Sequence, residues 1–176
     1  MKYLISLYFD EHTNRQIYKY MEAVTEATGN DYMFVHGVPP HITVASFETE
    51  NVETVINTLE PCFKSMQKGE ISWVGTGAFM TSVLYLNSVL NEYLQKIVLE
   101  VYGCITAIPD IRISKYYQPN QWLPHTTIGK KMTKEELVRG FQAVQGDFKV
   151  LLGHSVKVGL AQASPYEDIM VWEFIN

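Results

Sequence analysis

The chain has 176 residues, of which 47% are hydrophobic and 19% are charged, and its formal net charge is −5. This length suffices for one domain with a substantial core, and the composition argues against a disordered or repetitive chain. An acidic chain has few cations to neutralise many phosphates, so we expect no binding to extended duplex nucleic acid. A small pocket for one or two phosphates remains compatible with this charge.

The two cysteines, Cys62 and Cys104, have neither the spacing of a metal site nor that of a secreted disulfide framework. We interpret them as buried free thiols and expect a reducing, cytoplasmic location. Residues 4–9 are apolar, but acidic residues follow at once, so this stretch predicts a strand rather than a signal peptide. No apolar run approaches the roughly 20 residues that span a bilayer, and we expect no membrane association.

Hydrophobic patterning predicts strands and helices along the whole chain, without a linker. Apolar residues at helical spacing mark the helices, and β-branched or aromatic runs mark the strands. In chain order we expect a strand at 2–9, a helix at 10–28, a turn at 37–40, a strand at 41–47, a helix at 52–66, strands at 70–79 and 83–87, a helix at 91–105, a strand at 111–117, a strand within 123–128, a helix at 133–144, and strands at 149–162 and 169–174.

Several residues mark where the predicted helices begin and end. The expected N-terminal caps are Asp10, Asn51 and Thr133, and the expected C-terminal stop is Gly29. Pro61 is expected to kink or divide the helix at 52–66. The segment at 149–162 predicts one long strand, or two bent strands broken near Gly153.

Two short stretches share one pattern, Pro-Pro-His-Ile-Thr-Val and Leu-Pro-His-Thr-Thr-Ile. Because side chains alternate along a strand, His41 and Thr43 project from one face of their strand, and His125 and Thr127 project from one face of theirs. Of the five histidines, only these two have a hydroxyl residue at the second following position. We therefore expect the two pairs to line one cleft.

The elements that follow each motif also match, which indicates an internal duplication. A strand and a helix come first, and two strands follow, around Trp73 and Leu84 in one half and around Val158 and Val171 in the other. The spacing is 32 positions from His41 to Trp73 and 33 from His125 to Val158. Two copies packed about a pseudo-twofold axis would bring both histidines to a shared groove.

Two facing imidazoles suit acid–base chemistry near neutral pH, since each unperturbed pKa is about 6.5. The neutral ring would take a proton from an attacking hydroxyl or water, and the protonated ring would give one to the leaving oxygen. Phosphodiester cleavage needs both steps. The threonine hydroxyls are short donors that can hold the nonbridging phosphate oxygens. Which histidine is base and which is acid stays open.

The paired motifs resemble those of the 2H phosphoesterase superfamily, which includes the 2′-5′ RNA ligase-like proteins and cyclic nucleotide phosphodiesterases. The resemblance implies one bilobal α+β domain over residues 1–176, with a duplicated pseudo-twofold unit, antiparallel sheets around a central cleft and helices outside. It implies a metal-independent site without a cofactor, and substrates with a 2′,3′-cyclic, 1″,2″-cyclic or 2′-5′ phosphodiester. By this resemblance His41 and His125 match the catalytic pair, and Thr43 and Thr127 match the phosphate-holding pair.

Members of this superfamily often carry an arginine just after the second motif, where this chain has Lys130 and Lys131. A lysine neutralises phosphate as a point charge but lacks the bidentate fork of arginine. Lys130 is therefore a candidate substrate-binding residue, and the alternative is a solvated lysine pair in a turn.

Aromatic residues near the motifs are further candidates. Tyr116 and Tyr117 precede the second motif, close to two basic residues, and such a wall would stack a base and attract phosphate. Phe47, at the end of the first motif strand, would line the mouth of the cleft. The alternative for all three is core packing or a solvated surface. Trp122, which directly precedes the second motif, is interpreted as packing.

A metal site is the rival chemistry for two histidines. It needs a third ligand, and no His-x-His, His-x-x-x-His or Cys/His cluster lies near either motif. We interpret His12, His36 and His154 as surface or loop residues.

The sequence thus predicts a cytoplasmic phosphodiesterase, without metal or cofactor, that acts on a nucleotide or an RNA end. It does not indicate an oligomeric state, and we expect a monomer. One alternative is a non-catalytic nucleotide-binding or regulatory module on the same fold. Another is a structural or protein-interaction domain, in which the two histidines would not lie near each other.

Overall fold

The computed structural model describes residues 1–175 of the chain. Within this range there are eight β-strands, five α-helices and one turn of 3₁₀-helix. In chain order they are β1 (Lys2–Phe9), α1 (Glu11–Thr28), α2 (Tyr32–Val35), β2 (His41–Glu48), α3 (Val52–Phe63), β3 (Gly69–Phe79), β4 (Val83–Ser88), α4 (Glu92–Thr106), β5 (Arg112–Ile113), the 3₁₀ turn η1 (Lys115–Tyr117), β6 (His125–Lys130), α5 (Lys134–Asp147), β7 (Leu151–Ala163) and β8 (Tyr166–Glu173).

Most elements match the sequence-based expectations. The helices α1 and α5 begin where expected, because the predicted residues cap them. The Asp10 side chain accepts a hydrogen bond from the Thr13 backbone N–H at 2.7 Å and starts α1. Gly29 ends this helix with a left-handed φ of 78°. The capping box of α5 is formed by Thr133 and Glu136 in both directions.

Two helices differ from the expectation. Pro61 does not divide α3, which continues to Phe63 and ends three residues before the expected end. Because Pro61 lies in the last turn, its missing N–H interrupts little of the helix. The short helix α2 was not predicted, since four residues are too few to show a periodic pattern.

The prediction of a strand at 111–117 is wrong for most of its length. Only Arg112 and Ile113 pair with β2, at the end of that strand. The Ser114 N–H donates to the Ser46 carbonyl at 2.8 Å, and the chain then leaves β2 to form η1. The tyrosines of this segment therefore lie on a turn, not on a strand.

All strands belong to one antiparallel sheet, in the order β5-β2-β1-β7-β3-β4-β6, with β8 paired to β7. Strand β7 runs through Gly153 without a break. It pairs with β3 through residues 151–155 and with β1 through residues 155–162. One long strand thus joins the part of the sheet that holds the first motif to the part that holds the second.

From either end, the order β2-β1-β7-β3-β4-β6 begins with a motif strand, continues with one neighbouring strand and reaches a central strand. The motif strand β2 pairs with β1, which pairs with the central strand β7, and the motif strand β6 pairs with β4, which pairs with the central strand β3. The position of β4 thus corresponds to that of β1, and the short β5 is an addition at the outer edge of β2. The sequence-based match between the strands around Leu84 and Val171 is therefore wrong, because β8 pairs only with β7. The match between the strands around Trp73 and Val158 agrees with the central positions of β3 and β7. The duplication itself stays a prediction.

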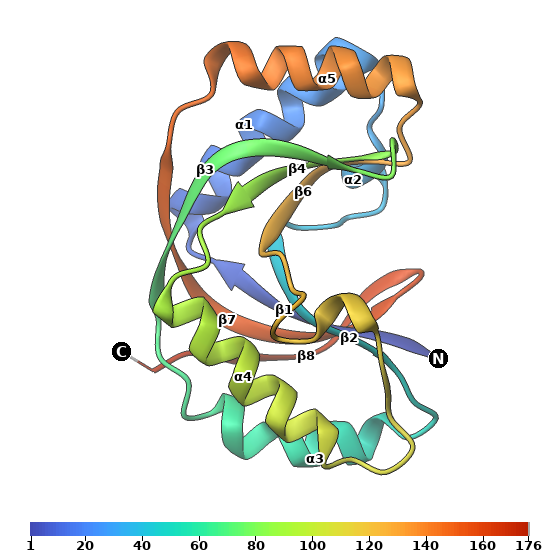
Figure 1. The fold of residues 1–176 in the computed structure, drawn as a ribbon, viewed down its shortest axis with the longest axis vertical. Coiled ribbons are helices and arrows are strands. Elements are labelled where there is room, and N and C mark those ends of the chain that lie inside the picture. Colours follow the sequence, from blue (N-terminus) through green and yellow to red (C-terminus); the bar gives the residue numbers. More distant parts are fainter. Residues whose placement is uncertain (176) are drawn as a thin grey trace.

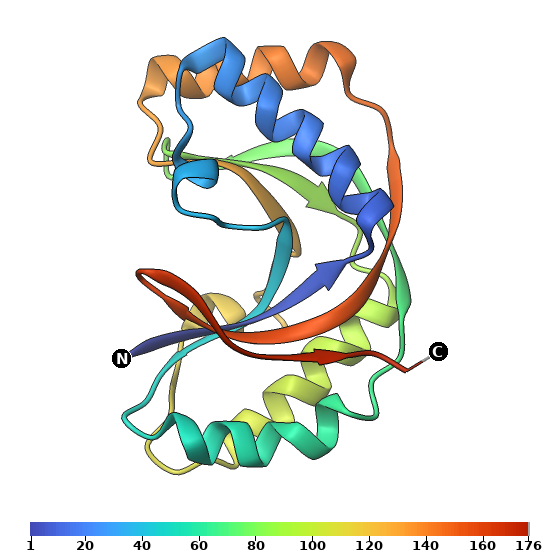
Figure 2. The same ribbon diagram turned by 180° about the vertical axis from the view of Figure 1, so that it is seen from behind.

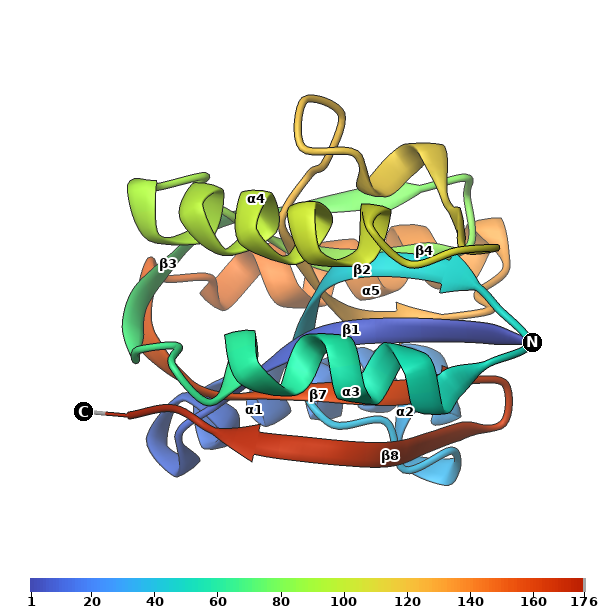
Figure 3. The same ribbon diagram turned by 90° about the horizontal axis from the view of Figure 1, so that it is seen from below.

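The helices form two pairs on the bent sheet (Figure 1). Helix α1 packs against α5, and α3 packs against α4. In Figures 1 and 2 the first pair lies at the top and the second at the bottom, with the strands between them. Figure 3 shows α3 and α4 running side by side. The fold is thus α+β, with an antiparallel sheet and helices outside it.

Strand β1 divides its residues between an apolar and a more polar face. The side chains buried in the hydrophobic core are Tyr3, Ile5, Leu7 and Phe9. The intervening residues on the other face are Lys2, Leu4, Ser6 and Tyr8. Ser6 and Tyr8 on this second face are also buried, at 0% and 8% exposure, whereas Lys2 is exposed.

The two cysteines are free, as predicted, but half-buried rather than buried. Burial, followed by a hydrogen bond with Cys104, raises the pKa of the Cys62 thiol to about 12. Among residues 1–175, no helix is both long enough and apolar enough to cross a membrane.

Replacing Trp73 with Phe is expected to destabilise the fold. The fully buried indole of Trp73 donates a hydrogen bond to the Thr126 hydroxyl at 3.0 Å, and Thr126 lies between the histidine and threonine of the second motif. The change leaves a cavity and a buried acceptor without its donor, so the free energy of unfolding should fall by about 2–3 kcal/mol. Urea unfolding followed by circular dichroism measures this loss.

Trp172→Phe is the matched control, because it removes the same volume from a buried tryptophan on β8. No residue in the described range accepts a hydrogen bond from the Trp172 indole, so the loss should be smaller by about 1 kcal/mol. Equal losses in the two variants would show that the Trp73–Thr126 bond adds nothing to stability.

Candidate active site

The two motif strands contact each other across the sheet. Strands β2 and β6 begin at His41 and His125, and they meet although neither pairs with the other. Figures 1 and 2 show them approaching between the two helix pairs. We call His41, Thr43, His125 and Thr127 together the histidine site.

A β-bulge in β2 fixes which side chains face the site. His41 lies opposite Tyr8 and Thr43 opposite Ser6, so both motif residues share the polar face of β1. The register then shifts, and Val44 is the extra residue.

This bulge corrects the prediction for Phe47. Unbroken alternation would place Phe47 on the face of His41 and Thr43, but the bulge reverses the alternation. Phe47 instead lies opposite Tyr3, is 1% exposed, and packs against the Tyr3 ring at a centroid distance of 6.0 Å. It is a core residue and does not line the mouth of a cleft.

Both histidine rings are held in the same way. The Nδ1 atom of His41 lies 2.8 Å from the Pro39 carbonyl, and that of His125 lies 2.8 Å from the Leu123 carbonyl. A carbonyl only accepts, so each Nδ1 carries the proton and donates it. Each neutral ring therefore presents an unprotonated Nε2 that can accept a proton.

The surroundings of His41 favour its neutral form. Its pKa is lowered to about 4, chiefly by burial, against the raising effect of the hydrogen bond to Pro39. Positive charge on His125 and on Lys130 also lowers this pKa, whereas the charge of Asp168 raises it.

The second histidine lies among aromatic rings. His125 meets the rings of Phe79 and Tyr85 edge-on, at centroid distances of 4.8 Å and 5.2 Å. Burial lowers the pKa of His125 from its ordinary value, and the hydrogen bond to Leu123 opposes this shift. Both histidines are thus half-buried bases whose neutral form is favoured.

The two threonines differ in their present partners. The buried Thr43 hydroxyl lies 3.2 Å from the Ser6 hydroxyl, and its side chain also interacts with Tyr117. The Thr127 hydroxyl is half-buried and has no hydrogen-bond partner among residues 1–175. Thr127 is therefore available as a donor without first breaking another bond.

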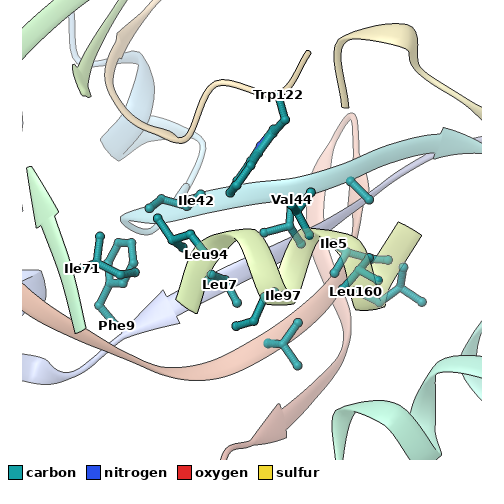
Figure 4. Close-up of a cluster of buried hydrophobic side chains, with 14 of the residues drawn as sticks. Ile5, Leu7, Phe9, Ile42, Val44, Ile71, Leu94, Ile97, Trp122 and Leu160 are labelled. Carbon is teal, nitrogen blue, oxygen red and sulfur yellow. The ribbon is translucent and has the colours of Figure 1, made fainter. Parts of the chain in front are cut away.

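Trp122 connects the two motifs. Its indole N–H donates to the Thr43 carbonyl at 2.9 Å, and the side chain is 6% exposed. Figure 4 shows the ring reaching down onto β2 between Ile42 and Val44. The interpretation of Trp122 as packing is therefore confirmed, and its bond ties the segment before the second motif to the first motif strand.

The remaining predicted residues lie in three different settings. Tyr117 is half-buried beside Thr43, whereas Tyr116 is 67% exposed on η1 with the Lys115 ammonium 5.2 Å from its ring centroid. Lys130 ends β6, and its charge reaches His41. The structure thus places Tyr117 beside Thr43, Lys130 at the other end of β6 from His125 with its Nζ atom 5.7 Å from the centroid of the Tyr32 ring, and Tyr116 at the surface.

A polar cluster beside His41 was missed in the sequence. The Tyr8 hydroxyl donates a short hydrogen bond to the Asp168 carboxylate and lies 2.6 Å from the Tyr166 hydroxyl. The Tyr166 ring lies 6.0 Å from the His41 ring between centroids. Burial, followed by the proximity of Tyr166 and Asp168, raises the pKa of Tyr8, so its hydroxyl keeps its proton.

One sequence feature could have indicated this polar cluster, namely the alternation of polar and apolar residues in β1. Ser6 and Tyr8 are polar residues at every second position of a strand otherwise read as buried on both faces. Tyr166 and Asp168 gave no such signal, because their place depends on the pairing of β8 with β7.

Among residues 1–175, no group of three or more His, Cys, Asp or Glu side chains is arranged to hold a metal ion.

Comparison with known proteins identifies the family of the chain. The family model of the 2′-5′ RNA ligase superfamily matches residues 13–156, which is most of the chain. The chain belongs to the 2′-5′ RNA ligase superfamily. The 2H phosphoesterase resemblance is thereby confirmed, and this membership supports a phosphodiesterase or RNA-processing role in general.

Several solved structures share this fold. The protein TT0787 of Thermus thermophilus is 12% identical with a TM-score of 0.64, covering 99% of this chain and 98% of that one. E. coli LigT in complex with 3′-AMP is 10% identical with a TM-score of 0.62 and the same coverages. Kluyveromyces marxianus Usb1 is 12% identical with a TM-score of 0.52, covering 96% and 97%. These likenesses show the fold. A search of curated protein sequences found no match.

Titration by NMR is expected to show both site histidines neutral at pH 7. Because burial lowers their folded pKa values, each ring should gain its proton at a lower pH than in the unfolded chain, with a midpoint of about 4 for His41. The ring C–H shifts, assigned with His41→Gln and His125→Gln, measure the midpoints. The urea-unfolded protein is the control, with midpoints of about 6.5. A midpoint at or above about 6.5 for folded His41 would contradict the electrostatic description.

Proposed function

We propose that this member of the superfamily is a metal-independent phosphodiesterase that acts on 2′,3′-cyclic or 1″,2″-cyclic phosphates or on 2′-5′ linkages, in nucleotides or at RNA ends. The observation that carries the proposal is the matched pair of Nδ1–carbonyl bonds. They leave two Nε2 atoms, on strands that contact each other, free to exchange protons with one phosphodiester.

The low pKa values of the histidines fit this chemistry once a phosphate is bound. In the free protein both rings are neutral, so neither is yet an acid. A phosphate anion between the rings favours the charged imidazolium, and one ring gains a proton as the substrate binds. That ring donates to the leaving ribose oxygen, while the other takes a proton from the attacking water. The two roles exchange when the reaction runs in the opposite direction.

The threonines hold the phosphate as charge gathers on its nonbridging oxygens. Thr127 has a free hydroxyl for this bond, and Thr43 turns its hydroxyl from Ser6 to the substrate. Hydrogen bonds that strengthen in the transition state accelerate the reaction, whereas equal binding of the ground state would not.

Aromatic residues near the histidine site provide a surface for the nucleoside. Tyr117 lies beside Thr43, and Phe79 and Tyr85 pack on His125. Rings of this kind stack on bases with little dependence on sequence. E. coli LigT, which has a similar fold, has been solved in complex with 3′-AMP, with ATP and with phosphate. These complexes support nucleotides as the ligand class of the present protein. We propose that the protein works as a monomer in the cytoplasm.

Substitution of either histidine is expected to abolish most hydrolysis of nucleoside 2′,3′-cyclic phosphates. Loss of one general acid or base costs on the order of 10² to 10⁴ in rate. The rates of wild-type protein, His41→Ala and His125→Ala are compared in the presence of EDTA, with release of nucleoside monophosphate as the readout. Wild-type activity should persist in EDTA, and both variants should fall by that factor.

His12→Gln is the control, because His12 is an exposed histidine on α1. Its rate should equal that of the wild type. Full activity in either motif variant, or loss of activity in EDTA, would overturn the proposal. Nucleotide binding without turnover across cyclic phosphates and 2′-5′ dinucleotides would favour the non-catalytic module instead.

A further inference from the structure

The polar cluster beside His41 lies at the free end of a hairpin. Its members are Tyr8 on β1 and Tyr166 and Asp168 on β8. Tyr166 is the first residue of β8 and pairs with Ala163, where the ladder between β7 and β8 ends. In the described part of the chain β8 pairs with no strand except β7, and Figures 1 and 2 show the turn of this hairpin curling away from the α3–α4 pair. Backbone pairing alone therefore does not hold Tyr166 beside His41.

Tyr8 crosses β7 to reach this hairpin. On β1 it lies opposite His41, and its ring lies over Gly159 of β7, where a β-carbon would collide with the ring. Gly159 thus leaves the space that the ring needs. The buried Tyr8 hydroxyl then reaches the side chains of Tyr166 and Asp168 on the far side of β7. Tyr8 therefore links the strand beside His41 to the hairpin end.

The donors and acceptors of the polar cluster fit in one direction. The Tyr8 hydroxyl has a single proton, which it donates to the Asp168 carboxylate. Its oxygen is therefore the acceptor for the Tyr166 hydroxyl, at 2.6 Å. A chain of hydrogen bonds that ends at a carboxylate is stronger than separate neutral bonds. The Tyr166 hydroxyl is thus held in a defined place.

The ring of Tyr166 lies against the imidazole of His41. The two ring centroids are 6.0 Å apart, and the ring planes are inclined at 31°. The bond from Nδ1 of His41 to the Pro39 carbonyl fixes one atom of the imidazole but still lets the ring swing about that atom. A neighbouring ring restricts this motion, so Tyr166 keeps Nε2 of His41 pointing in one direction. Groups that transfer protons depend on such support from the side chains around them.

The other half of the sheet repeats this arrangement around His125. Tyr85 lies on β4, which corresponds in position to β1, and a β-carbon at Gly77 of the central strand β3 would collide with its ring. The rings of Tyr85 and Phe79 both contact His125. Each motif histidine is therefore accompanied by a tyrosine that lies over a glycine of a central strand, and each has an aromatic ring against its imidazole. At His41 this ring comes from a hairpin end and depends on hydrogen bonds.

We propose that Tyr166 is a positioning residue for His41, and that Tyr8 and Asp168 act by holding Tyr166 against the imidazole. Without the Tyr166 ring, Nε2 of His41 leaves the line of proton transfer, while the residues that bind the phosphate stay in place. This inference rests on the proposed function, since the proton transfer by His41 belongs to it.

The rates of hydrolysis of uridine 2′,3′-cyclic phosphate test the inference. In Tyr166→Leu the kcat should fall by about 10- to 100-fold with an unchanged KM, because a misplaced proton-transfer group weakens only the transition state. Tyr8→Phe, which removes both hydrogen bonds of Tyr8, should lower kcat in part. Tyr8→Phe/Tyr166→Leu should match Tyr166→Leu alone, because Tyr8 acts through Tyr166.

Three kinetic results would overturn the inference. An unchanged kcat in Tyr166→Leu would show that the ring does not position His41. A raised KM with an unchanged kcat would show that Tyr166 binds the substrate instead. Independent losses that add in the double variant would show that Tyr8 does not act through Tyr166.

Tyr93→Phe is the matched control for Tyr8→Phe. The half-buried Tyr93 hydroxyl donates to the Gln67 carbonyl at 3.1 Å and lies 2.5 Å from the Ser155 hydroxyl, so this variant also loses two hydrogen bonds of a phenol. Over residues 1–175, no hydrogen bond or ring contact joins Tyr93 to either motif histidine. Its kcat should equal that of the wild type. An equal fall of kcat in both variants would show a general loosening of the fold and would overturn the positioning role.

NMR separates this inference from the proposed function, because it needs no turnover. Tyr8→Phe is the informative variant, since it leaves the Tyr166 ring in the chain and removes only the bonds that hold it. The ring C–H resonances of His41 should move in Tyr8→Phe and stay in place in Tyr93→Phe, and those of His125 should stay in place in both. This result upholds the positioning of His41 even if no substrate is hydrolysed, which would overturn the proposed function alone. Hydrolysis by the wild type with His41 resonances that do not respond to Tyr8→Phe would overturn the positioning role alone.

Discussion

The pairing of β7 with two different strands is the constraint on which the histidine site depends. One end of β7 pairs with β1, which pairs with the motif strand β2, and the other end pairs with β3, which leads through β4 to the motif strand β6. The distance between the histidines is therefore set by backbone hydrogen bonds in a continuous sheet rather than by a flexible linker. The Trp122 indole adds a direct bond between the two motif regions. Such a framework holds two proton-transfer groups in a fixed relation.

Local hydrogen bonds, burial and nearby charges determine the protonation state of the two histidines on this framework. Two backbone carbonyls fix the protons on Nδ1, and burial makes the neutral rings the resting state. Asp168 opposes this effect at His41, while Lys130 reinforces it. The net charge of the chain, −5, does not reveal these local effects on the two histidines. An acidic protein can still present a phosphate site, because only the charges within about one Debye length matter there.

The sequence predicted the parts of the structure that depend on local pattern. The helix caps at Asp10, Gly29 and Thr133 and the placement of the motifs on strands follow from neighbouring residues, and all are confirmed. The bulge at Val44 depends on how β1 pairs with β2, so the position of Phe47 was predicted on the wrong face. The polar cluster of Tyr8 with two residues of β8 joins distant parts of the chain, 160 positions apart for Tyr8 and Asp168, and no local pattern reveals such a contact.

The central claim is that one phosphate bridges the two histidines. A crystal structure of the protein with uridine and vanadate, which together mimic the five-coordinate transition state, tests it directly. The account predicts vanadate oxygens within hydrogen-bond distance of Nε2 of both His41 and His125, with the Thr43 and Thr127 hydroxyls on the remaining oxygens. Vanadate bound to only one imidazole, or away from both, would contradict the account.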